Sequence, residues 1–259
     1  MNPPGPRQPS NFAMKVFLIA FAGILLAALA TIAGVSLSRS APGKEAVHEA
    51  RPIAGFHRLD ITGQATVTLV QGSAEGVSID APASRRVQTD VRDGTLVIEV
   101  RDRRAAWQWL SGRDAGGVRI TINLRDLDRV ETAGAVTLAA ERLAGGDLHF
   151  DLAGASTLRI GELQASSLKL EGSGATNVTI AGKVARQDVH VSGAGSYDAA
   201  RLASDEAAVE VSGAGKAVVD ARSKLAVEIS GAGTVEYLGH PQLTQSISGI
   251  GKITRRESS

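Results

Sequence analysis

The sequence predicts an all-β protein, in which a parallel β-solenoid of about eight coils follows an N-terminal transmembrane helix. Three observations support this fold class: a glycine motif that recurs at regular spacing, apolar residues that alternate around each motif, and a composition poor in aromatic side chains. Gly accounts for 29 of the 259 residues and aromatic residues for only 3%, whereas compact globular cores usually contain more large rings. The composition therefore favours thin, stacked layers.

The glycine motif recurs along the C-terminal two thirds of the chain, mostly as Ser-Gly-Ala-Gly. Successive first glycines are 20, 20, 19, 20, 18 and 18 residues apart, the spacing of one supersecondary unit per repeat. An earlier, decayed copy is centred on Gly63. A corner of a coil needs φ values that other residues avoid. We therefore expect the recurrent glycines to be structural corners: Gly134, Gly154, Gly174, Gly193, Gly213, Gly231 and Gly249.

The residues around each glycine alternate between apolar and polar types. Apolar residues lie four and two positions before the glycine and four positions after it, as Phe150, Leu152 and Leu158 do around Gly154. This period of two predicts strands with one buried face. At about 3.3 Å per residue, one repeat traces roughly 60–66 Å, which suits one turn of a three-sided coil and is too short for a propeller blade. A leucine-rich repeat would need a helical segment in each unit, and the alternation leaves no room for one.

The N-terminal segment predicts the compartment. Residues 16–37 carry no charge, and these 22 residues, at about 1.5 Å each, are enough to cross a bilayer. Arg7 and Lys15 precede the span, so the positive-inside rule predicts a cytoplasmic tail over residues 1–15 and export of the remainder. The alternative is a cleaved signal peptide and a secreted protein, although the apolar region of such a peptide is usually shorter, roughly 7–15 residues.

The chain is therefore divided into five segments. After the cytoplasmic tail, a signal-anchor helix over 16–37 leads through a polar linker over 38–52 to the solenoid domain over 53–254, and residues 255–259 form a polar tail. The expected location is the bacterial inner membrane, crossed once, with the solenoid domain in the periplasm or outside the cell.

Charge and residue types exclude several function classes. Lys+Arg 28 against Asp+Glu 27 leaves a net charge of +1, so no overall field draws the protein to nucleic acid. The absence of Cys excludes disulfides, thiolate metal sites and cysteine nucleophiles. The five His residues lack the spacing of a zinc site. The segment 213–216 (Gly-Ala-Gly-Lys) lacks the first Gly and the Ser or Thr of a phosphate-binding loop. We expect no cofactor and no enzymatic activity.

A mostly acidic column is expected on the outward face of the coils, three positions before each corner glycine: Glu131, Asp151, Glu171, His190, Glu210, Glu228 and Ser246. Like charges in adjacent coils, about 4.8 Å apart, repel each other unless they are hydrated, paired or bridged. Arg129, His149 and Lys169 in the next outward column are expected to pair with the first three. Glu210 and Glu228 are weak candidates for a cation or sugar site, and a hydrated solenoid face is the simpler interpretation.

A tryptophan-containing insertion is the second candidate site. It contains both tryptophans of the chain, Trp107 and Trp109, together with Arg103, Arg104 and Arg113. Trp and Arg are the residues most enriched in binding hot spots, so we interpret this loop as the contact surface for a ligand or partner. In the alternative interpretation, the rings fold back and cover the apolar end or side of the coil.

Several segments occur together in an order that is specific as a set. They are an entry segment, a strand, a hairpin-like segment, the recurrent Ser-Gly-Ala-Gly motif and a closing segment, over residues 56–63, 67–72, 94–98, 133–233 and 239–249. Over residues 53–254 the chain resembles the head GIN domain family of auto-transporter adhesins. The resemblance implies a right-handed parallel β-helix in a bacterial envelope protein, with no catalytic residues to carry over. The chain departs from the family in its first two motifs, which have Ala for Ser, and in a longer loop over 102–117.

Two function classes follow from these observations. The first is a membrane-anchored binding or scaffold module of the cell envelope, adhesin-like and non-catalytic, which contacts an envelope polysaccharide or an envelope protein. The alternative is a β-helix carbohydrate-active enzyme, or a cation-binding module, that uses the acidic column. Removal of a carboxylate distinguishes them, because an enzyme loses turnover whereas a module keeps its binding.

Overall fold

The computed structural model describes residues 46–83, 85–102 and 117–257, and this part of the chain is built from strands without a helix. No helix in it is long and apolar enough to cross a membrane. The predicted signal-anchor helix over 16–37 lies outside the described residues. The all-β class is therefore confirmed for the described part.

The strands are numbered in chain order. They are β1 (Ala46–Arg51), β2 (Arg58–Gln71), β3 (Gly76–Pro82), β4 (Arg85–Arg92), β5 (Thr95–Asp102), β6 (Val118–Leu124), β7 (Arg129–Gly154), β8 (Thr157–Gly174), β9 (Asn177–Gly193), β10 (Ser196–Gly213), β11 (Lys216–Gly231), β12 (Thr234–Leu238), β13 (Gln242–Gly249) and β14 (Lys252–Arg255). Several of them are long because one strand runs around more than one side of a coil.

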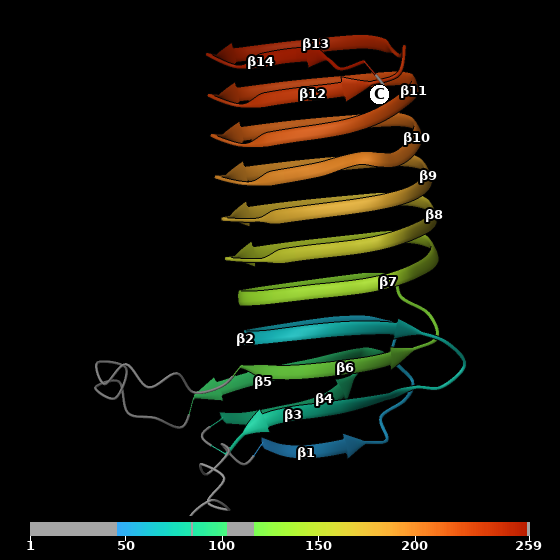
Figure 1. Ribbon diagram of the computed structural model, residues 1–259, viewed down its shortest axis with the longest axis vertical. Coiled ribbons are helices and arrows are strands. Elements are labelled where there is room, and N and C mark those ends of the chain that lie inside the picture. The colour runs from blue at the N-terminus through green and yellow to red at the C-terminus, as the bar shows by residue number, and fades with distance from the viewer. Residues whose placement is uncertain (1–45, 84, 103–116, 258–259) are drawn as a thin grey trace, which may run out of the picture. The chain divides into compact units, whose positions relative to one another are not determined.

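From β7 to β14 the chain winds as a parallel β-solenoid, with each coil stacked on the one before it (Figure 1). The pairing keeps the sequence repeat in register, so that Gly154 lies beside Gly174 and Gly174 beside Gly193. The solenoid has about six turns rather than the eight or so expected from the sequence. The difference arises because residues before β7 build a different kind of sheet around the first coil.

This N-terminal part closes one end of the solenoid. One edge of β2 pairs with β7, whereas its other edge pairs with β5 and β6. The strands before β7 include antiparallel pairs: β4 with β5, and β3 with both β1 and β6. Gly63 in β2 is consequently in register with Gly134 in β7 although a long insertion separates them in the sequence.

Each coil has three sides, as the β8 strand illustrates. Inward and outward residues alternate along it, and this alternation is interrupted between Ile160 and Leu163 and again between Leu163 and Leu168. The third bend lies between Gly174 and the next strand. The interior is filled by columns of aliphatic and aromatic residues in register, for example Phe150, Leu170, Val189, Val209 and Val227, all at most 3% exposed. The predicted inward columns are therefore confirmed.

The recurrent glycines lie at one of the three bends, and all of them except Gly134, which is inside β7, end a strand. From Gly134 to Gly249 they have φ between +91° and +125°, a region that side chains other than glycine rarely adopt. A Cβ added at any of them would lie 2.4–2.7 Å from the carbonyl oxygen of the glycine in the preceding coil. The residue after each glycine donates its N–H to that same carbonyl, as Ala155 does to Gly134 at 2.8 Å. Both the backbone conformation and the close stacking require glycine there.

A hydrogen-bonded polar cluster lies inside the solenoid between β9 and β11. Gln187 is 0% exposed, and its amide nitrogen donates to Ser204 Oγ at 2.8 Å while Tyr197 Oη donates to its amide oxygen at 2.9 Å. Ser204 Oγ donates in turn to the backbone carbonyl of Asp220 at 2.7 Å. The cluster lies beside the coil in which β10 shifts its register against both neighbours. Because its members are paired, their burial carries little desolvation penalty.

Candidate functional site

The residues of the two candidate sites fall into different parts of the chain. Trp107, Trp109, Arg103, Arg104 and Arg113 lie outside the described residues, between the end of β5 and the start of β6. The acidic column lies entirely within the described solenoid. Of the two candidate sites, atomic contacts are therefore described for the acidic column alone.

The structure places the acidic residues in one column on a single side of the solenoid. Strand pairing sets Asp151 beside Glu171, Glu171 beside His190, His190 beside Glu210, and Glu210 beside Glu228. Strand alternation explains the arrangement, because the residues on either side of each acid point into the core. The column thus runs along the outward face over β7 to β11.

The column also extends further toward the N-terminal end than expected. Asp60 in β2 lies beside Glu131, and its pKa is raised, mainly by partial burial and then by the charge of Glu131. The sequence carried a signal for Asp60, since it stands three positions before Gly63 as Glu131 does before Gly134. Because the motif around Gly63 is degenerate, the repeat alone did not place Asp60 in the column.

In the first half of the column, cations of the neighbouring outward column contact the acids. Arg129 contacts both Glu131 and Asp151, the latter at 3.9 Å. Lys169 Nζ lies 2.7 Å from Glu171 Oε1, and this hydrogen bond is the main reason that the pKa of Glu171 is lowered. Glu131, Asp151 and Glu171 therefore each have a cationic partner within the protein.

His149 lies among these groups and is only partly accessible. Arg129 donates to its Nδ1 at 3.1 Å, and its Nε2 lies 3.8 Å from Glu171 Oε1. Burial, followed by the positive charge of Arg129, lowers the pKa of His149. The imidazole is therefore held neutral beside the ion pairs.

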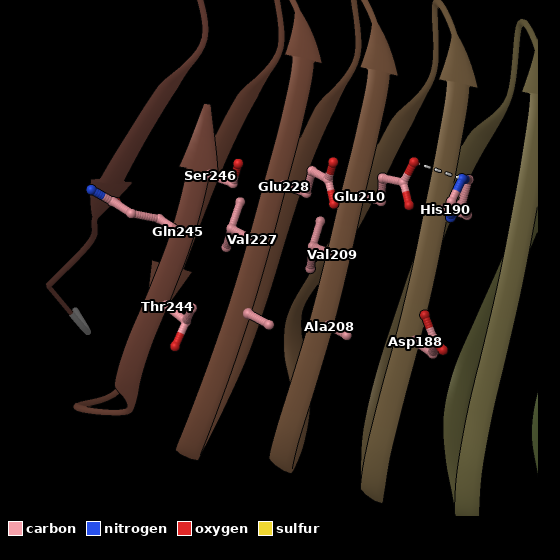
Figure 2. A pocket seen from close by; sticks show the side chains of 11 residues that line it. Asp188, His190, Ala208, Val209, Glu210, Val227, Glu228, Thr244, Gln245 and Ser246 are labelled. Carbon is pink, nitrogen blue, oxygen red and sulfur yellow. Dashed lines mark ion pairs between the residues drawn. The ribbon is translucent and has the colours of Figure 1, made fainter. Parts of the chain in front are cut away.

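Beside the second half of the column, from His190 to Ser246, the neighbouring outward column of the described solenoid contains no Lys or Arg. His190 Nε2 lies 3.0 Å from Glu210 Oε1 (Figure 2). Glu228 has no ion pair or hydrogen bond with another side chain of the described part of the chain. The neighbouring outward column, which holds His149 and Lys169 lower down, continues as Asp188, Ala208, Ala226 and Thr244. The net charge of this half is consequently negative.

The change from long to short side chains creates a shallow groove of about 270 Å³ on this face. Ala208 and Ala226 form its floor together with the buried Val209 and Val227. Its polar lining comes from Asp188, His190, Glu210, Glu228, Thr244, Gln245 and Ser246 (Figure 2). The geometry offers carboxylates and hydroxyls around a small apolar floor, so it suits a ligand with hydrogen-bond donors or positive charge.

The groove lacks the arrangement of a metal centre. Within residues 46–83, 85–102 and 117–257, no group of three or more His, Asp or Glu side chains is placed to hold a metal ion. Glu210 and Glu228 are adjacent, and the other ionisable residues that line the groove are Asp188 and His190, of which His190 already contacts Glu210. No cation is needed to explain the position of these side chains.

A second ladder of ion pairs lies on another side of the coils and was not evident in the sequence. Arg142 contacts Glu162 at 3.1 Å, and Glu206 contacts both Arg186 and Lys224, at 2.8 and 2.9 Å. Each pair joins adjacent coils, and the pKa of both glutamates is lowered by these hydrogen bonds. In the sequence, these ion pairs are indicated only by the spacing of the two partners, which is about one repeat.

The fold and the outward face define a class of protein: an all-β parallel solenoid with a stacked glycine corner and charged residues in columns along its sides. The chain belongs to the family described as "Putative auto-transporter adhesin, head GIN domain", whose model matches residues 55–241. The resemblance inferred from the sequence is therefore confirmed.

Several solved structures have a similar fold. A putative adhesin from Bacteroides fragilis is 21% identical and has a TM-score of 0.75, with 83% of this chain and 99% of that chain covered. A putative lipid binding protein from Parabacteroides distasonis is 18% identical, with a TM-score of 0.62 and coverage of 82% and 96%. A putative adhesin from Parabacteroides merdae is 19% identical, with a TM-score of 0.61 and coverage of 83% and 97%. At these identities the similarity establishes the fold alone. No curated protein matches the chain.

Proposed function

We propose that this chain is a non-catalytic binding or scaffold module of the bacterial envelope, anchored in the inner membrane by a signal-anchor helix over 16–37. In this proposal residues 1–15 are cytoplasmic, residues 38–52 form a linker, and the domain over 53–254, a right-handed solenoid, lies in the periplasm or outside the cell. The right-handed crossover is the rule for parallel strands. The 22 uncharged residues of the span support the anchor.

The observation that best supports a binding role is the regularity of the outward face. In-register stacking holds each outward side chain at a fixed position relative to the next coil, so the described coils present a regular surface that suits binding. Family membership and the similar structures described as adhesins agree with this role.

We further propose that the loop with Trp107 and Trp109 is the main contact surface. The described sides of the solenoid consist mainly of small, aliphatic and charged residues, which offer little burial energy to a partner. A Trp side chain can bury about 150–250 Å², and the flanking Arg103, Arg104 and Arg113 can pair with anionic groups. Envelope polysaccharide, envelope protein and lipid headgroups are the partners of matching chemistry. Lipid is included because one similar structure is described as a lipid binding protein.

The groove at Glu210 and Glu228 supports the second candidate function, a carbohydrate-active or cation-binding site. This function would need the two carboxylates to act together on a bound ligand. Glu228 is free of cationic partners among the described residues, so it could serve such a role. Matched double variants of the loop and of the groove separate the two proposals.

The test is binding of the full chain, reconstituted into nanodiscs of neutral lipid, to immobilised lipopolysaccharide, peptidoglycan fragments and anionic phospholipid vesicles. The expected result is that Trp107→Ala with Trp109→Ala abolishes binding, whereas Glu210→Gln with Glu228→Gln leaves both binding and the melting temperature nearly unchanged. Loss of binding, or of sugar release from peptidoglycan, in the glutamine pair alone would contradict the proposal and favour the groove.

A further inference from the structure

The C-terminal end of the solenoid presents an open strand edge. β13 pairs only with β11, and β14 only with β12. Within the described part of the chain nothing lies beyond them, and Figure 1 shows both strands at the end of the stack. The backbone N–H and C=O groups that join earlier coils to one another therefore have no partner along this edge among residues 46–83, 85–102 and 117–257.

An apolar side chain on the core side of β13 is exposed although its counterparts are buried in the complete coils. Ile247 is 44% exposed, whereas Ile229, its partner in β11, is 0% exposed. Ile250 is 86% exposed and adds a large apolar side chain at an outward corner where the other coils have small, exposed Ala residues. Gln245 occupies the column of Val227 and extends away from the coils below (Figure 2). The edge thus combines free backbone groups with exposed apolar side chains.

The charge pattern of this edge differs from that of the rest of the face. Every earlier coil has an ionisable residue three positions before its corner glycine, and β13 has Ser246 there. The strand β13, Gln-Leu-Thr-Gln-Ser-Ile-Ser-Gly, has no charge at all and pairs with β11 without a register shift. By contrast, the edge strand β1 at the other end carries His48, Glu49 and Arg51. Charges on an edge strand are a usual protection against pairing with another chain, and β13 lacks that protection.

The sequence of β13 is also complementary to itself in an antiparallel arrangement. When Gln245 is placed opposite Gln245 of a second copy, Leu243 lies opposite Ile247 on the core side and Thr244 opposite Ser246 on the outward side. No like charges would face each other, apolar residues would meet apolar residues, and the two Gln amides could hydrogen-bond to each other. A paired polar group at the centre would specify this register over others, as a buried Asn does in coiled coils.

We propose that two copies of this chain associate end to end through antiparallel pairing of β13 about a two-fold axis at Gln245. The interface is isologous, because the same strand of both copies forms it. The pairing continues the sheet across the two-fold axis and covers Ile247. It rests on β13 alone and does not depend on the proposed contact role of the tryptophan loop.

The absence of Cys from the chain permits a clean test with single-cysteine variants of the full chain in detergent micelles. In Gln245→Cys the two thiols would face each other with Cβ atoms about 4.5–5.5 Å apart, so mild oxidation is expected to give a disulfide-linked dimer. The matched control is Ser248→Cys in the same strand. Its thiol would face Gln242 of the second copy and lie roughly 20 Å from its own counterpart, so little dimer is expected.

A second variant tests the association without cross-linking. Gln245→Lys changes an exposed side chain and would set two ammonium groups opposite each other in the dimer. Sedimentation of the reduced full chain is expected to show a dimer whose dissociation constant rises at least ~10-fold in this variant, with the melting temperature of the monomer unchanged. A chain that sediments as a monomer at ~100 µM, equal cross-linking at positions 245 and 248, or a dimer that Gln245→Lys leaves intact would each overturn the proposal.

Discussion

Replacement of a corner glycine tests the central feature of the fold. Gly213 has φ +122°, and a Cβ there would lie 2.6 Å from the carbonyl oxygen of Gly193. A non-glycine residue in this backbone region costs about 1–3 kcal/mol. Relief of the clash would also lengthen the hydrogen bond from Ala214 N–H to the Gly193 carbonyl, now 2.9 Å, at a further cost of about 1–3 kcal/mol. Gly213→Ala is therefore expected to lower the free energy of unfolding by about 2–6 kcal/mol.

The measurement is urea unfolding followed by circular dichroism, with Gly146→Ala as the matched control. Gly146 lies in β7, has no positive φ, and an added Cβ would meet no atom within 4 Å. The control is expected to change the free energy of unfolding by no more than ~0.5 kcal/mol. A similar small change in Gly213→Ala would refute the view that the stacked corner requires glycine. The midpoint rather than the slope should shift, because the surface exposed on unfolding is the same.

Two further predictions concern the core and the pH dependence. Val211→Asp places a carboxylate at a position that is 0% exposed and should lower the free energy of unfolding by several kcal/mol. Lys216→Ala removes a surface ion pair with Glu236 and should lower it by less than ~1 kcal/mol. Equal losses of stability for the two variants in thermal unfolding would contradict the inward position of Val211. Because the pKa of His149 is lowered in the folded state, the unfolded chain binds more protons between that lowered pKa and the ordinary histidine pKa of about 6.5. The contribution of His149 to stability should therefore be present above pH ~6.5 and fall as the pH decreases below it. A difference in melting temperature between the wild type and His149→Gln that does not change from pH 8 to pH 5 would contradict this assignment.

The repeat was the most informative part of the sequence. Parallel in-register stacking places equivalent residues of successive repeats side by side. Residues one repeat apart in the sequence therefore form columns in the structure. The inward columns around Phe150 and Val209 and the strand alternation could therefore be predicted without coordinates. The register of the acidic residues followed from the same rule.

The candidate groove was only partly predictable. The replacement of long side chains by Ala208 and Ala226 is visible in the sequence, but the hollow depends on how far the side chains at the rim reach across adjacent coils. The second ladder of ion pairs and the buried contacts of Gln187 with Tyr197 also depend on such distances. Side-chain rotamers and local register shifts determine these contacts, and a repeat pattern does not specify either of them.

The all-β class, the stacked coils and the corner glycines could be predicted from the sequence because they depend on local periodicity and on neighbours one repeat apart, and the resemblance to the family was carried by the ordered set of segments. How the solenoid begins and ends depends on contacts that the repeat does not specify. The insertion between β2 and β7 pairs strands that are distant in sequence, partly in antiparallel fashion, and so reduces the number of turns to about six. At the other end, Ile247 matches its repeat position and yet is exposed, because no described coil follows to cover it.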